Sequence, residues 1–180
     1  MAPNGISRII FSAALLGLSA TAASAHVGHG AEGFVHGFMH PIGGLDHLLA
    51  MLASGLLGAV IGGKAWWLVP LTFIAAMVAG GALGASGFAL PLVETMILAS
   101  VVVLTGLAIF GRSLGLSRLL PLVGGFALFH GFAHGAEMPA NVSALEYAAG
   151  FAGSTALLHG AALIAVLGYT IAFPAKRHAI

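Results

Sequence analysis

The sequence predicts an all-α integral membrane protein, a five-helix transmembrane bundle that follows a cleaved signal peptide. The 180 residues are 59% hydrophobic and only 6% charged, whereas about a quarter of the residues in a soluble domain are charged. After residue 39, apolar runs long enough to cross a bilayer recur along the rest of the chain. An earlier apolar run is shorter and ends in a cleavage motif.

The N-terminal region has the pattern of a secretory signal peptide. Arg8 precedes an apolar run that ends in Ala23-Ser24-Ala25, the small-x-small pattern of a cleavage site. We predict that residues 1–25 are removed, and an uncleaved first helix is the alternative. Cleavage would leave residues 26–39 as a histidine-rich extracytoplasmic N-terminal segment and residues 40–180 as the five-span transmembrane domain.

The predicted spans cover residues 40–62, 66–84, 90–110, 119–137 and 144–173, and the last is long enough to tilt or to break near Gly150 and Gly153. Cytoplasmic loops carry an excess of Lys and Arg. This rule predicts a multi-pass protein of the bacterial cytoplasmic membrane, with a periplasmic mature N-terminus and a cytoplasmic C-terminus. Every Lys and Arg of the mature chain would then be cytoplasmic: Lys64, Arg112, Arg118, Lys176 and Arg177.

The first polar motif, HPIGGLDH, covers residues 40–47 at the start of the first span. We expect His40 to cap this helix, with Pro41 at its first position, where a missing N–H does no harm. His40 and His47 are seven residues apart and would share one helix face. Asp46 either binds a metal from the side or orients His47 as a ligand.

The second motif, FHGFAHGAE, covers residues 129–137 in the fourth span, with His130, His134 and Glu137 along one stripe. At 1.5 Å per residue in antiparallel helices, His47 and His130 would lie at similar depth. Ionisable groups inside apolar segments are costly, and imidazole with carboxylate suits a divalent cation. We therefore predict one metal site built by both motifs; the alternative is that single histidines only form interhelical hydrogen bonds.

Other residues are further candidates for metal capture or for the pathway. Met51 lies one turn deeper than His47 on the same helix face, where it would either bind metal or only pack between helices. Glu94 starts the third span and either binds metal or complements the helix dipole. His159 lies in the fifth span, and the sequence does not fix its depth in the membrane. The outer segment would be a capture arm or a polar tether, and its histidines are His26, His29 and His36.

Composition excludes several classes of function. A net charge of +1 without a basic stripe excludes nucleic-acid binding. The absence of cysteine excludes disulfides and thiolate metal sites. The chain contains no G-x-x-x-x-G-K-[ST] loop, so we expect it not to hydrolyse ATP. We also expect no permanently bound cofactor.

The sequence HPIGGLDHLLAM, followed by FHGFAHGAE, resembles the HupE/UreJ family of hydrogenase and urease accessory membrane proteins. The resemblance covers the whole chain and implies a non-enzymatic, secondary uptake permease for Ni²⁺ or Co²⁺ that supplies metalloenzyme maturation. It implies that His40, Asp46 and His47 are the key metal residues. His130, His134 and Glu137 of the second motif would join them. The expected partners are the divalent ion, the lipid bilayer and cytoplasmic metallochaperones, and an oligomer is compatible with the sequence.

Two other functions are compatible with the same residues. An intramembrane zinc-dependent hydrolase would use a metal-bound water with Glu137 or Glu94 as the base, although the chain has no H-E-x-x-H motif. A metal sensor would bind without transporting. The sequence also leaves nickel and cobalt open, because nitrogen and oxygen ligands bind both.

Overall fold

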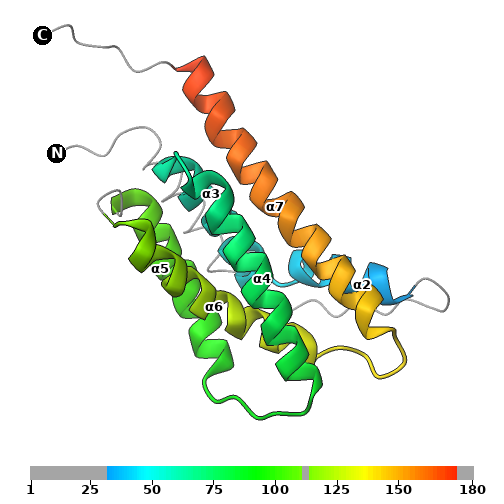
Figure 1. Ribbon diagram of the computed structural model, residues 1–180. Coiled ribbons are helices and arrows are strands. Elements are labelled where there is room, and N and C mark those ends of the chain that lie inside the picture. Colours follow the sequence, from blue (N-terminus) through cyan, green and yellow to red (C-terminus); the bar gives the residue numbers. More distant parts are fainter. Residues whose placement is uncertain (1–31, 111–113, 174–180) are drawn as a thin grey trace, which may run out of the picture.

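The computed structural model describes residues 32–110 and 114–173, and within these ranges all regular structure is helical. Figure 1 shows the arrangement of the helices. Four of them are long and apolar enough to cross a membrane, or up to five if α2 (Glu32–Gly43) and α3 (Leu45–Ile61) count as one bent span. The predicted all-helical membrane fold is therefore confirmed, while the predicted signal peptide lies outside the described residues. The helices are α2 (Glu32–Gly43), α3 (Leu45–Ile61), α4 (Ala65–Ala85), α5 (Val93–Phe110), α6 (Leu116–Ala136) and α7 (Ala144–Ala172).

The prediction of one continuous helix over residues 40–62 is wrong. Gly44 has an extended backbone, with φ −99° and ψ 119°, and the helices on either side of it meet at 82°. Two adjacent glycines have low helix propensity, and Pro41 supplies no N–H to the helix. His40 therefore lies in the last turn of α2 instead of capping the span. The predicted boundary between residues 39 and 40 falls inside α2.

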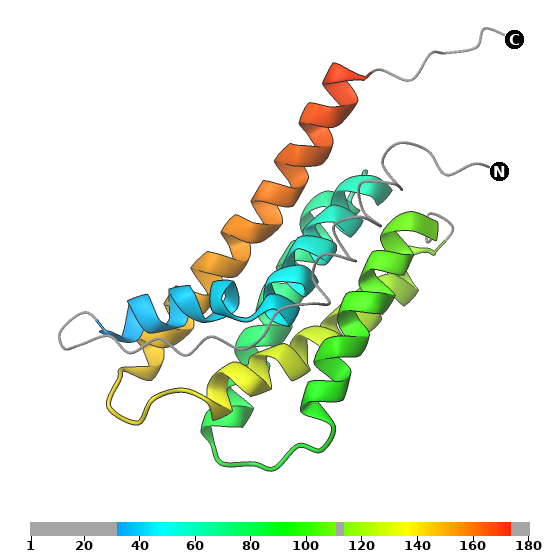
Figure 2. The same cartoon turned by 180° about the vertical axis from the view of Figure 1, so that it is seen from behind.

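Glycines allow α4 and α6 to pack backbone against backbone. A Cβ at Gly80 would collide with the carbonyl of Leu128, and a Cβ at Gly131 would collide with the carbonyl of Met77. Gly84 and Gly135 make similar contacts one turn further along. Small residues at these positions permit the close approach that stabilises membrane helix pairs. The two helices run side by side in both ribbon views (Figures 1 and 2).

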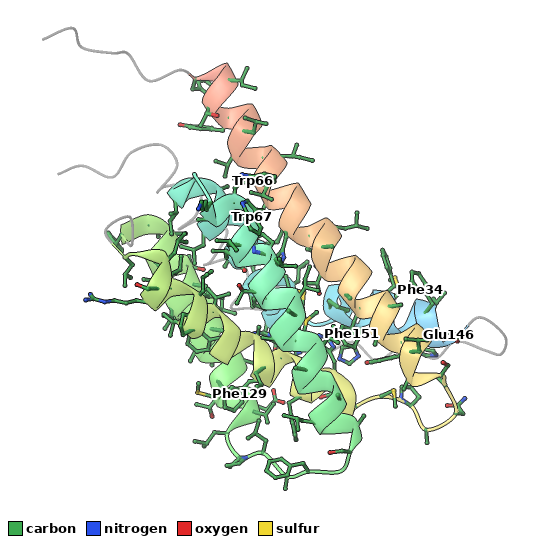
Figure 3. All side chains as sticks on the ribbon, viewed as in Figure 1. Phe34, Trp66, Trp67, Phe129, Glu146 and Phe151 are labelled. Carbon is green, nitrogen blue, oxygen red and sulfur yellow. The ribbon has the colours of Figure 1, made fainter. Side chains whose placement is uncertain are left out.

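A second close contact joins α2 to α7. Gly37 faces the backbone of Tyr147, and Gly150 faces the backbone of Phe34. Figure 3 shows Phe34 and Glu146 where α2 crosses the beginning of α7. Helix α7 is continuous, so of the two expected alternatives, a tilt or a break near Gly150 and Gly153, the break does not occur. Its C-terminal half diverges from the other helices in both ribbon views (Figures 1 and 2), and the apolar side chains there are exposed, as expected for contact with lipid.

The described charges are divided between the two ends of the bundle. Asp46, Glu94 and Glu137 lie at one end, with Glu146 in the first turn of α7; we call this the acidic end. Lys64, at the start of α4, and Arg118, in the first turn of α6, lie at the opposite end, where Figure 3 shows the exposed Trp66 and Trp67. The positive-inside rule predicts that this basic end is cytoplasmic.

Candidate metal centre

Three histidines from three helices meet near the acidic end. The ring of His40 on α2 lies 4.7 Å from that of His134 on α6, and the ring of His47 on α3 lies 4.8 Å from His134. One ligand nitrogen of each residue lies within 4.8 Å of the other two. Metal–nitrogen bonds of about 2.1 Å place two ligand nitrogens at most about 4.2 Å apart. Shifts of less than about 1 Å would therefore allow all three to bind one ion.

The bend at Gly44 brings His40 to this position. Because α2 and α3 meet at 82°, the His40 ring turns back to within 5.8 Å of the His47 ring. His47 lies in the first turn of α3, and His134 lies in the last turn of α6. The predicted pairing of His40 with His47 is present, but the bend between two helices produces it instead of a shared helix face.

Asp46 fixes the orientation of His47. Its Oδ1 atom accepts a hydrogen bond from the His47 backbone N–H at 2.8 Å and lies 3.0 Å from Nδ1 of the ring. An ionised carboxylate only accepts hydrogen bonds, so Nδ1 carries the hydrogen. The other nitrogen, Nε2, is buried and has no hydrogen-bond partner within residues 32–110 and 114–173. This carboxylate–histidine pair is the arrangement that orients histidine ligands in metal sites.

Glu137 contacts His40 at the edge of the same cluster. Its Oε2 lies 3.2 Å from His40 Nε2, just beyond the last residue of α6. The hydrogen bond from His40 holds the pKa of Glu137 below its ordinary value. The carboxylate therefore stays ionised and supplies negative charge beside the three histidines.

His130 lies next to the three histidines and has a different partner. Its Nε2 is 2.7 Å from the hydroxyl of Ser100 on α5, and that hydroxyl donates its single hydrogen to the carbonyl of Ile97 at 2.6 Å. His130 Nε2 is therefore the donor to Ser100. The remaining nitrogen, Nδ1, is buried without a partner, and the ring lies 5.1 Å from that of His47.

Comparison with known proteins assigns the chain to a family. Residues 13–178, which include both polar motifs, match the family described as HupE / UreJ protein. The chain belongs to the HupE/UreJ family. One HupE/UreJ relative, Protein HupE from Rhizobium leguminosarum bv. viciae, is 44% identical over 153 residues, which are 85% of this chain and 80% of the relative. No solved structure matches. The predicted resemblance is confirmed.

The other candidates in this HupE/UreJ protein lie outside the group of three histidines. Glu94 is exposed in the first turn of α5, and His36 is half-buried on α2. Met51 and His159 are buried deeper between the helices. His26 and His29 lie outside the described residues. A metal role for these residues stays a prediction.

Three neighbours of the histidines were not among the residues predicted from the sequence. Ser100 contacts His130, the buried Tyr147 ring lies 6.2 Å from the His40 ring, and Phe151 stacks on His134 at 5.1 Å. Figure 3 shows Phe151 within the bundle. Ser100 offered a signal, a hydroxyl in an apolar run, but a serine that bonds only its own helix looks the same in sequence. Tyr147 and Phe151 offered no signal in the sequence.

The donor set suits a divalent transition metal. Neutral imidazoles are ligands for Ni²⁺, Co²⁺ and Zn²⁺, and two carboxylates supply opposing charge. The bases that the structure describes, Lys64 and Arg118, lie at the other end of the bundle, so they do not oppose a cation here. The arrangement can extract a cation from water and hold it between three helices.

Proposed function

We propose that this HupE/UreJ protein is a secondary uptake permease for a divalent transition metal, with Ni²⁺ as the first candidate substrate and Co²⁺ as the second. The observation that carries the proposal is the cluster of His40, His47 and His134, which joins three separate helices at the acidic end. When the ligands of a metal site come from different helices, the geometry of the site can change as the helices move. In the predicted orientation the ion passes from the periplasm to cytoplasmic metallochaperones and supports metalloenzyme maturation.

The exposure of the polar groups falls in steps toward the centre of the bundle. The side chains of Glu137 and Asp46 are 55% and 38% exposed, and those of His40 and His47 are 26% and 9% exposed. His134 is fully buried. Negative charge at the mouth attracts a hydrated cation, and the imidazoles then replace its water step by step. Binding has to stay modest, because the ion also has to leave.

The membrane potential supplies enough energy for uptake. A charge that moves inward gains about 2.3 kcal/mol per 100 mV, so a divalent ion gains about 4.6 kcal/mol. Since about 1.4 kcal/mol corresponds to a factor of ten, this supports an accumulation of roughly 2,000-fold. The proposed transport therefore needs no ATP.

The test is nickel flux into liposomes that contain the purified full-length chain and carry an inside-negative diffusion potential. We expect the wild type to accumulate ⁶³Ni²⁺ and the Asp46→Ala/His47→Ala double variant to lose at least about nine-tenths of the rate, because both the ligand and its orienting carboxylate are gone. Glu146→Gln, at an exposed carboxylate in the first turn of α7, is the control and should keep the wild-type rate.

Equal uptake by the wild type and the double variant would end the proposal. Binding without flux in the wild type would favour a metal sensor. Metal-dependent cleavage of a substrate would favour the intramembrane hydrolase, although the HupE/UreJ family is not known as a family of enzymes.

A further inference from the structure

Two methionine sulfurs and a threonine hydroxyl meet below the histidine cluster. Thr155 on α7 donates to Sδ of Met51 on α3 at 3.1 Å, and its oxygen lies 3.6 Å from Sδ of Met77 on α4. All three side chains are fully buried. Met51 follows His47 by four residues on α3, so it lies one turn, or about 6 Å, further into the bundle. The three residues therefore form a layer directly beneath the proposed entry site.

His159 lies one turn beyond this layer on the same face of α7. It follows Thr155 by four residues, and its ring is 5.2 Å from that of Phe73, which precedes Met77 by four residues on α4. On the third helix, Gly55 follows Met51 by four residues and faces the backbone of His159. The same three helices that hold the sulfur layer thus hold His159.

The polar groups of this inner region have almost no partners. His159 is 1% exposed, and neither of its ring nitrogens forms a hydrogen bond with the residues that the structure describes. The hydroxyls of Ser54 and Ser154 are also buried without partners. A buried polar group without a partner loses the hydrogen bonds that it makes to water in the unfolded chain, and this destabilises the fold. A polar ligand that enters this region would offset that cost.

Asp46, Glu94, Glu137 and Glu146 lie at the acidic end, so a cation that moves further inward meets only neutral lone pairs among the described side chains. Thioether sulfur and imidazole are both ligands for transition metals. A neutral thioether binds a divalent ion more weakly than a carboxylate does, and weak successive sites are what conduction requires.

We propose that Met51, Met77 and His159 form a second, inner transition-metal site, and that Thr155 positions the two sulfurs. The inference deepens the proposed function and rests on it for its role, because the inner site would receive the ion that the three histidines release. The binding itself can be tested without transport.

The test uses X-ray absorption at the nickel edge on the purified full-length chain with two equivalents of Ni²⁺. The chain has no cysteine and six methionines, so any sulfur bound to nickel comes from methionine. We expect a sulfur shell in the wild type. The shell should disappear in Met51→Leu/Met77→Leu, in which the side-chain volume is kept, and the bound nickel should fall from about two equivalents to about one.

Met96→Leu is the matched control, because Met96 is a partly buried methionine on α5 that packs against the same core. It should keep the sulfur shell. The inference is overturned if the wild type shows no sulfur shell, or if the shell survives in Met51→Leu/Met77→Leu. Loss of the nitrogen shell along with the sulfur shell in that variant would also overturn it, because the histidine cluster should still bind.

Flux measurements separate this result from the proposed function. We expect Met51→Leu/Met77→Leu and His159→Gln to reduce nickel flux at least tenfold, with the affinity of the outer cluster unchanged within about twofold. If wild-type liposomes move no nickel but the sulfur shell is present, the permease proposal fails and the inner site stands as a binding site. If the wild type transports and the double methionine variant transports equally fast, the inner site is not on the route and the inference fails.

Discussion

At the scale of single residues, the proposed site depends on which nitrogen of each histidine is free. Asp46 holds Nδ1 of His47, and Ser100 accepts from Nε2 of His130. In each ring the other nitrogen is left buried without a partner. Partners of this kind fix the tautomer of a metal-binding histidine and raise its basicity. Asp46 is therefore a positioning residue for His47.

Replacement of Asp46 should weaken metal binding without removing a ligand. We expect Asp46→Asn to lower the Ni²⁺ affinity of the purified protein by about 10- to 100-fold, the usual effect of losing such a partner. Titration calorimetry in detergent would measure it. Glu146→Gln, at an exposed carboxylate in the first turn of α7, is the control and should bind as the wild type does. Wild-type affinity in Asp46→Asn would show that the carboxylate does not orient the ligand.

Glu137 should stay ionised when protons begin to compete with metal for the histidine ligands. The pKa of Glu137 is lowered by its hydrogen bond with His40, so this contact is present above that low pKa and is lost only as the pH falls through it. Metal binding needs neutral imidazole, so protons compete with the ion for the histidine ligands.

Nickel uptake should therefore fall as the external pH drops from 8 to 5, because protons compete with the ion for the imidazole ligands. We expect Glu137→Gln to lower the rate at every pH but to keep this decline, because Glu137 is not the group that titrates. A pH series of liposome flux for the wild type and the variant measures this. A flat profile in Glu137→Gln would contradict the explanation.

At the scale of helices, two features position the cluster. The break at Gly44 folds α2 across α3 and presents His40 to His134. The glycine contact between α4 and α6 sets the position of α6, which carries His130 and His134. His134 follows Gly131 by three residues, so the helix contact and a proposed metal ligand lie within one turn.

A methyl group in that contact should damage stability and binding together. The Cβ of Gly131→Ala would collide with the carbonyl of Met77, so we expect a loss of about 1–3 kcal/mol, as for overpacked cores, and weaker Ni²⁺ binding. Thermal unfolding in detergent and nickel titration would show both effects. Gly125→Ala on the same helix meets open space and should be neutral or stabilise by up to about 1 kcal/mol. Equal behaviour of the two variants would mean that the close approach is not required.

At the scale of the whole molecule, the charge distribution predicts the direction of transport. The described carboxylates and the three histidines lie at one end, while Lys64 and Arg118 lie at the other. The positive-inside rule then predicts that the histidine cluster faces the periplasm. An inside-negative potential drives a cation from that face inward, so the predicted orientation and the proposed uptake depend on each other.

Single cysteines test this orientation, because the natural chain contains none. Ser86 and Ser117 are both exposed, one just after α4 at the acidic end and the other at the start of α6. We expect a membrane-impermeant maleimide, once past the outer membrane, to label Ser86→Cys in intact cells and to label Ser117→Cys only after the inner membrane is opened. The cysteine-free chain is the control. The opposite pattern would reverse the predicted topology and exclude uptake through this entrance.

Much of the fold and part of the site could be read from the sequence. Long apolar runs can satisfy their backbone groups in a membrane only as helices, so composition was enough to predict the helical bundle. Ionisable residues are expensive in such runs, so His47, His130 and His134 stood out as candidates without any structure.

The exact grouping of ligands depended on tertiary structure. Sequence spacing placed His40 on the same helix as His47, but the 82° bend at Gly44 moved it to another helix. Spacing also gave no reason to pair Thr155 with Met51, which is 104 residues away. A linear pattern records periodicity within one helix, whereas contacts between helices depend on where chains bend and how closely glycines let them approach. The sequence by itself determined the helical membrane fold and the kinds of ligand available, and the packing of the helices decided which of those ligands meet.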